Sequence, residues 1–261
     1  MRARLQGALN RTLERRRAET ASEMTILEHL QELRRRIMIS VLGLLAATTA
    51  SFFFAERFIR VLEEPARAAG IEFIATDVTE VFSTVIKVAL IGGVAIASPV
   101  ILSQIILFVA PGLTARERRV LYLVLPLAIL FFFLGTLFAY WVVLPRAFDF
   151  FFAFGSDLAA LMPRISTYLG FVTTLSLWMG LVFETPLIMG ILSWLDIVRA
   201  ATFGRYRRFA VVGAFVAGAF ITPTGDPVNL MLVSIPIVVL YEIGALVARF
   251  VGRRPIVADL D

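Results

Sequence analysis

The sequence predicts an all-α protein with six transmembrane helices in a single domain. Two features of composition lead to this fold class: 59% of the 261 residues are hydrophobic, and the mean hydropathy is +0.86. The third is charge, because only 17% of the residues are charged, against about 25% in a soluble domain. These charges are bunched between long uncharged runs, as expected for a chain that crosses a bilayer repeatedly.

Four runs are long enough to cross a membrane as helices, which takes about 20 apolar residues. In chain order they are Ile37–Ala55, Val81–Val109 with Lys87, Val120–Leu144, and Tyr168–Leu192 with Glu184. Two further runs, Phe209–Ile221 and Val228–Ala245, flank a Pro-Gly-Asp turn and are predicted to form an antiparallel pair. The fifth run has 13 residues and would cover only about 20 Å, which is too short for an ordinary bilayer.

Charge asymmetry predicts that both ends of the chain face the cytoplasm. With six spans, the segments on the side of the termini carry 19 basic and nine acidic residues, a net charge of +10. The segments on the opposite side carry five basic and nine acidic residues, a net charge of −4. Basic residues concentrate on the cytoplasmic side of membrane proteins.

The domain boundaries follow from the same pattern. We expect residues 1–23 to be a disordered cytoplasmic extension, residues 24–249 to form the membrane domain, and residues 250–261 to be a cytoplasmic tail. No cleavable signal peptide is predicted, because the first 36 residues hold nine arginines and no apolar core. The absence of cysteine and the single histidine, His29, argue against disulfides, thiolate chemistry and a histidine-based metal site. No metal or other cofactor is expected.

A helix is predicted to begin ahead of the first span. Thr25 and Glu28 have the spacing of a capping box, and apolar side chains then recur at helical spacing. Glu32 lies on another face, where it either pairs with Arg36 one turn later or meets a partner. Acids are unexpected beside an anionic leaflet, which attracts basic side chains.

A second acid, Glu117, stands among arginines in the loop between the second and third spans. Thr114 and Glu117 again form a capping box after the Pro111-Gly112 turn, so Glu117 has a structural role at the start of the third span. A carboxylate held at a helix N-terminus is also placed to meet a ligand, and the two roles are compatible. Two surface acids in a basic setting, Glu32 and Glu117, suggest a cationic ligand, and a guanidinium suits carboxylates because it binds them bidentately.

Seven blocks follow one another along the chain: HLQELRRRI (29–37), IATDV (74–78), SPVILSQIILFVAPGLTARERR (98–119), GTLFAYWVVLPRAFDFF (135–151), YLGFVTTLSLWMGLVFETPL (168–187), VVGAFVAGAFITP (211–223) and IPIVVLYEIG (235–244). In this order they resemble the TatC family, the multispanning component of twin-arginine protein translocases. The resemblance implies a glove-like six-helix fold with a concave face, in the cytoplasmic (inner) membrane of a prokaryote. It also implies that the protein binds signal peptides with paired arginines and exports folded proteins, driven by the proton gradient.

The resemblance implies particular partners and site residues. The partners are single-span proteins of the TatA and TatB type, the bilayer, the signal peptides of folded cargo and further copies of the chain, with no nucleic acid. Glu117 would bind an arginine of the signal peptide, Glu32 would help to hold the pair, and Phe108 would contact its hydrophobic part. The implied signal-peptide site comprises Glu32, Arg34, Phe108, Pro111, Leu113, Glu117 and Arg119.

Charged residues within the spans have competing interpretations. Glu184 is either a hydrogen-bonded helix contact beside the Pro186 kink or, as the resemblance implies, a polar residue of the concave face tied to transport. Lys87 and Glu242 lie nearer span ends and are expected to reach the interface. Asp226 precedes Pro227 and is predicted to cap the last span. The family usually has Thr-Pro-Pro-Asp at this periplasmic turn, whereas this chain has one residue more.

Three further features lie toward the outer face. Asp77 and Glu80 form a box-like pair that opens the second span. The aromatic run FDFFFAF (148–154) is expected to anchor at the interface or to contact a partner. The short edge of spans five and six, around Ala219, Phe220 and Thr222, is expected to thin the bilayer or to receive the single-span partners.

Two other function classes remain as alternatives. A small secondary transporter also uses short helices and a midplane acid such as Glu184, but no inverted repeat is evident. An enzyme is disfavoured, because the sequence has no Gly-rich phosphate loop, no G-x-S-x-G motif and no metal-ligand spacing.

Overall fold

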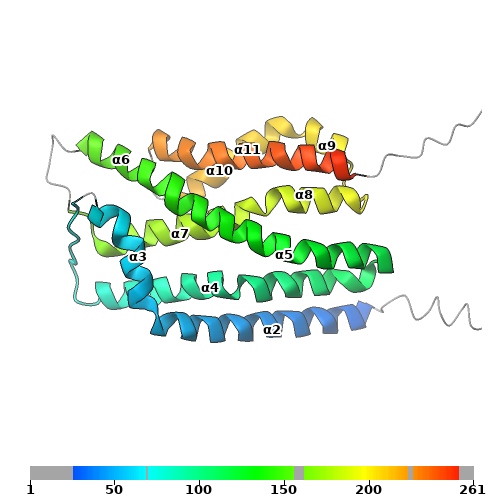
Figure 1. Ribbon diagram of the computed structural model, residues 1–261, viewed down its shortest axis with the longest axis horizontal. Coiled ribbons are helices and arrows are strands. Elements are labelled where there is room, and N and C mark those ends of the chain that lie inside the picture. Colours follow the sequence, from blue (N-terminus) through cyan, green and yellow to red (C-terminus); the bar gives the residue numbers. More distant parts are fainter. Residues whose placement is uncertain (1–25, 69, 156–161, 223–225, 253–261) are drawn as a thin grey trace, which may run out of the picture.

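The computed structural model describes residues 26–68, 70–155, 162–222 and 226–252, and these residues are almost entirely helical (Figure 1). The predicted extension 1–23, the Thr25 half of the first capping box and the extra residue of the 223–225 turn lie outside the described residues. The helices are α2 (Ile26–Phe53), α3 (Ala55–Ala68), α4 (Glu80–Val109), η1 (Ala110–Gly112), α5 (Ala115–Phe138), η2 (Ala139–Val143), α6 (Leu144–Gly155), α7 (Ile165–Phe183), α8 (Thr185–Trp194), α9 (Ala200–Arg205), α10 (Arg207–Ile221) and α11 (Pro227–Val251).

Five helical segments in the described part of the chain are long and apolar enough to cross a membrane. They are Leu27–Phe53, Glu80–Gly112, Glu117–Phe151, Ile165–Trp194 and Pro227–Val251. The remaining predicted span, α10, has 15 residues and covers only about 22 Å. Helix α10 is as short as the fifth apolar run predicts, whereas the prediction of a short sixth helix is wrong, because α11 has 25 residues.

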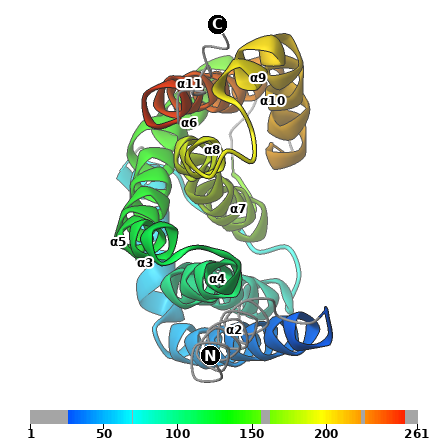
Figure 2. The same cartoon turned by 90° about the vertical axis from the view of Figure 1, so that its right-hand side faces the viewer.

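The helices form a curved layer with a concave side, as predicted. Helix α2 begins and α11 ends at the same end of the bundle (Figure 1), which we call the termini end; the opposite end is the distal end. Viewed from the termini end, α2 and α4 flank one edge of the concave side and α10 flanks the other, with α7 and α8 recessed between them (Figure 2).

Glycines let neighbouring helices approach closely. A Cβ atom at Gly93 of α4 would lie 2.6 Å from the Cα of Thr48 on α2, and one at Gly135 of α5 would lie 2.9 Å from the Cα of Gly180 on α7. Such contacts are under 3.0 Å, which real Cβ atoms essentially never show. Small residues at these positions permit the tight helix packing that stabilises membrane bundles.

Several local predictions need correction. The lead-in helix and the first span are one continuous helix, α2. Helix α3 was not predicted, because its amphipathic, charged sequence does not form an apolar run. The aromatic run continues the third span as α6, and its first residue, Phe148, is buried in the core and stacks on Tyr168. The anchor prediction is therefore wrong for Phe148.

Candidate functional site

At the termini end, Glu32 is bound by an arginine of its own helix. Arg36 lies 2.5 Å from the Glu32 carboxylate and also donates a hydrogen bond of 3.0 Å to Oε1 of Gln104 on α4. Both charged side chains are less than a fifth exposed. The predicted Glu32–Arg36 pair is therefore confirmed, and the link to Gln104 was not predicted, because 68 residues separate the two partners.

An aromatic contact joins the same two helices one turn nearer the terminus. The ring of His29 stacks on Phe108, with centroids 4.5 Å apart and planes 26° apart. This contact holds Phe108 beside the Glu32 side of α2. Sequence reasoning singled out Phe108 but not His29, whose partner arises only from the packing of α2 against α4.

Hydrogen bonds between Thr114 and Glu117 connect the loop after α4 to the first turn of α5. Its first residues form the short helix η1, and Thr114 then caps α5 with both halves of a capping box. The Thr114 N–H and hydroxyl donate to Oε2 of Glu117 at 3.1 and 2.9 Å, and the Glu117 N–H donates to Oγ1 of Thr114 at 3.4 Å. Leu113 packs against a small buried cluster that includes Ala110, and Pro111 is half-buried. The capping prediction is confirmed.

The two arginines of the predicted site, Arg34 and Arg119, are both exposed. Arg34 lines a shallow pocket of about 340 Å³ formed by the exposed side of α2, together with Gln31, Arg35 and Met38. It therefore lies on a different face of α2 from the Glu32–Arg36 pair. Arg119 is exposed in the first turns of α5.

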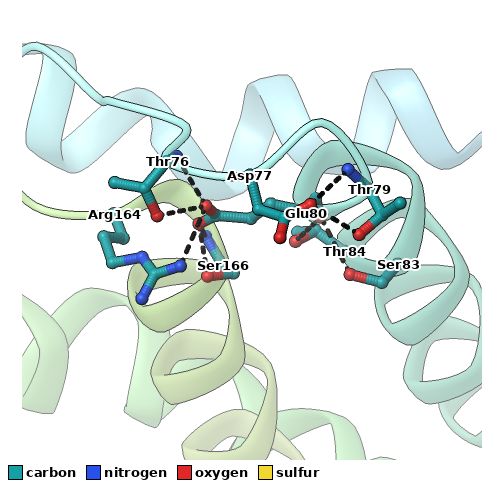
Figure 3. Close-up of polar contacts among 8 residues, drawn as sticks. All are labelled: Thr76, Asp77, Thr79, Glu80, Ser83, Thr84, Arg164 and Ser166. Atoms are coloured by element: carbon teal, nitrogen blue, oxygen red, sulfur yellow. Dashed lines mark hydrogen bonds and ion pairs between the residues drawn. The ribbon is translucent and has the colours of Figure 1, made fainter.

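A second polar cluster lies at the distal end (Figure 3). The sequence predicted a role for Asp77 and Glu80, but not their partners. Asp77 and Glu80 do not form the predicted box: Asp77 accepts hydrogen bonds from the N–H and hydroxyl of Thr79, at 2.8 and 2.7 Å. The Thr79 N–H is the main group that holds the pKa of Asp77 below its usual range. Glu80 turns instead toward the loop before α7.

Glu80 ties three segments of the distal end together. Its buried carboxylate accepts the Thr76 N–H at 2.8 Å, the Ser166 hydroxyl at 2.5 Å and a guanidinium N–H of Arg164 at 3.2 Å. Beside it, Ile74 and Arg164 form an isolated parallel bridge. No local signal identified this cluster, because Arg164 and Ser166 come more than 80 residues later.

The remaining predicted residues lie on or beside α7, α8 and α11. Glu184 is buried at the break between α7 and α8, and its Oε1 has no hydrogen-bond partner among the described residues. Asp226 caps α11 as predicted, accepting the Asn229 N–H at 2.8 Å. Glu242 pairs with Arg207 of α10 at 2.5 Å instead of reaching the interface alone.

The proposed partner edge on α10 is partly accessible. Ala219 and Phe220 are exposed, with Phe220 85% exposed. Thr222 is buried, and its hydroxyl donates to the carbonyl of Gly218 at 2.8 Å. Within the described ranges, no group of three or more His, Cys, Asp or Glu side chains is placed to hold a metal ion.

Comparisons with known proteins point to one family. A family model described as Sec-independent protein translocase protein (TatC) matches residues 28–236. The chain is 35% identical over 231 residues to the TatC protein of Carboxydothermus hydrogenoformans, covering 88% of this chain and 95% of that one. It is 40% identical over 231 residues to the chloroplastic TATC of Arabidopsis thaliana, covering 88% and 68%. A crystal structure of a twin arginine translocase receptor, TatC, matches with a TM-score of 0.80 at 35% identity, covering 87% of this chain and all of that one.

Proposed function

Because the chain belongs to the TatC family of Sec-independent protein translocase components, we propose that it is the signal-peptide receptor of a twin-arginine translocase. Cargo recognition takes place at the termini end, which the excess of basic residues assigns to the cytoplasm. The protein is thus a multi-pass membrane protein with both termini inside. The observation that carries the proposal is that Glu32 already holds a guanidinium, that of Arg36, in a mostly buried position.

Arg36 stands in for a cargo arginine in the unoccupied receptor. An incoming guanidinium replaces it at Glu32, and Arg36 keeps its hydrogen bond to Gln104. Because one buried ion pair is exchanged for another, the carboxylate is never left unpaired, which would be costly. The planar, bidentate geometry of guanidinium explains why lysine is a poor substitute.

Glu117 receives the second arginine from the first turn of α5. The capping box fixes the position of its carboxylate through Oε2, so little side-chain entropy is lost on binding. Phe108, held by His29, offers an apolar surface to the hydrophobic part of the signal, and Pro111 and Leu113 shape the loop between the two acids. Arg34 and Arg119 are exposed and keep the region basic.

Transport beyond recognition involves further components. Single-span partners of the TatA and TatB type dock on the exposed Ala219 and Phe220 of α10, with the buried Thr222 supporting that helix end and Asp226 capping the helix that follows. The buried Glu184 at the α7–α8 break contributes to transport, which the proton gradient drives. The receptor works as an assembly of several copies.

A binding measurement tests the receptor role. Fluorescent signal peptides carrying Arg-Arg or Lys-Lys are titrated onto the purified protein in nanodiscs, and wild type is compared with Glu117→Gln. Glutamine preserves the capping box and removes only the charge. We expect wild type to prefer Arg-Arg and Glu117→Gln to bind it about thirtyfold more weakly, equivalent to ~2 kcal/mol.

The control is Glu56→Gln, which removes an exposed acid from α3 at the distal end. This variant should bind as wild type does. An Arg-Arg preference that survives Glu117→Gln limits Glu117 to its capping role. If wild type binds neither peptide, the receptor role is wrong, and proton-coupled transport through Glu184 becomes the function to test.

A further inference from the structure

The concave side holds a pocket whose lining shares only Phe220 with the residues of the proposed functions. It has a volume of about 450 Å³ and lies between α4, α7 and α10. Its polar side chains are Lys87, Ser166, Thr167, Thr173 and Thr174, and its aromatic side chains are Phe171 and Phe220. The pocket therefore combines one cation, several hydroxyls and an apolar wall.

Lys87 is the only lysine in the sequence, since the other 24 basic residues are arginine. It is exposed within a membrane-spanning helix and makes no hydrogen bond or ion pair with any other described residue. An ionised side chain in hydrocarbon costs several kcal/mol unless it finds a partner or water. Either the surroundings of Lys87 are wet, or a ligand supplies the negative charge.

The length of α10 decides where Lys87 stands relative to the bilayer surface. The last residues of α10, Phe220 and Ile221, line the same pocket as Lys87, so the distal end of α10 is level with it. Because α10 covers only about 22 Å, the lipids beside it must thin, and their headgroups then descend to the pocket. Lys87 thus meets the phosphate layer instead of the hydrocarbon.

The local charge also favours an anion. Ser166 and Thr167 lie in the first turn of α7, where the helix dipole is positive. The nearby acid, Glu80, is already engaged by Arg164 and Ser166. The field at the pocket is therefore positive, and a singly charged anion neutralises it.

We propose that Lys87 and the hydroxyl of Thr167 bind the phosphate of an anionic phospholipid, whose acyl chain lies against Phe171 and Phe220. The aromatic wall distinguishes this ligand from free phosphate, which has no apolar part. A carboxylate on a partner helix has the same charge, but thinning brings lipid phosphates to this depth in any bilayer.

The unique lysine makes the test specific. An amine-reactive reagent is applied to the wild-type protein in nanodiscs of phosphatidylcholine alone or with phosphatidylglycerol, and acylation of Lys87 is resolved from the chain's N-terminal amine by peptide mapping. Phosphatidylglycerol should slow the reaction of Lys87 severalfold. Equal acylation rates of Lys87 in both bilayers would contradict the proposal. Equal protection of Lys87 by inorganic phosphate would contradict it as well. Protection that appears only when a single-span partner is present would assign the pocket to that partner.

Substitution gives an independent measurement. Native mass spectrometry counts phosphatidylglycerol retained by wild type, Lys87→Gln and Lys87→Arg. Lys87→Gln should retain it about tenfold more weakly, and Lys87→Arg should retain it as wild type does. The matched control is Arg60→Gln, which removes an exposed cation of α3 and should leave retention unchanged. Equal losses in Lys87→Gln and Arg60→Gln would show non-specific attraction and overturn the site.

Discussion

The carboxylate of Glu80, at the start of α4, accepts a guanidinium N–H from Arg164, 84 residues later, at 3.2 Å. Together with the Ser166 hydroxyl and the Thr76 N–H, this pair holds the loop before α4 against the beginning of α7 (Figure 3). At the distal end, α4 and α7 are thus joined by side-chain contacts between segments that lie far apart in the sequence.

We expect Glu80→Gln to destabilise the protein, because glutamine cannot accept all of these hydrogen bonds and leaves Arg164 without its partner. Thermal unfolding in detergent should show a fall in Tm of several degrees. The control is Glu56→Gln, which breaks an exposed i,i+4 pair, and such pairs contribute little. Equal shifts in the two variants would contradict a stabilising role for the Glu80 cluster.

Arg36→Gln should increase affinity for a twin-arginine peptide, since it removes the cation that competes for Glu32. A gain of about fivefold, equivalent to ~1 kcal/mol, corresponds to the net contribution of one typical hydrogen bond. Titration of the Arg-Arg peptide in nanodiscs measures it. Weaker binding in Arg36→Gln would mean that Arg36 belongs to the site itself and is not a stand-in for cargo.

Thr114→Ala should cost about 1 kcal/mol of stability through the lost helix cap. It should also weaken peptide binding, because Glu117 loses the Thr114 hydroxyl that helps to orient its carboxylate. Thr114→Ser, which keeps the hydroxyl, is the matched control and should retain the stability and the peptide affinity of wild type. Chemical unfolding and peptide titration on the same samples separate the two effects; full binding in Thr114→Ala would show that capping does not position Glu117.

Gly93→Ala should destabilise the contact between α2 and α4 by about 1–3 kcal/mol, the usual cost of overpacking, because its Cβ would press on the Thr48 backbone. Gly213→Ala in α10 is the control, since nothing lies within 4 Å of its added Cβ and alanine favours the helix. The two variants should move Tm in opposite directions. A neutral Gly93→Ala would mean that the helices separate at little cost.

The sequence by itself determined the features that depend on neighbouring residues. The apolar runs predicted the long spans and the short α10, and threonine–glutamate spacing predicted the cap of α5. Glu32 and Arg36 could be paired from helical spacing alone. Each of these features involves residues within one helical turn or one span, so both partners can be identified from their spacing in the sequence.

Only the tertiary structure decided which distant segments meet. The link from Arg36 to Gln104, the stacking of His29 on Phe108, the Glu80–Arg164 cluster and the pocket around Lys87 all join residues that different helices bring together. Helix α3 was missed for a related reason, because its amphipathic face is defined by what it packs against and not by an apolar run. Side-chain partners across helices depend on crossing angles and on glycine contacts such as Gly93 with Thr48, which residue order alone does not specify.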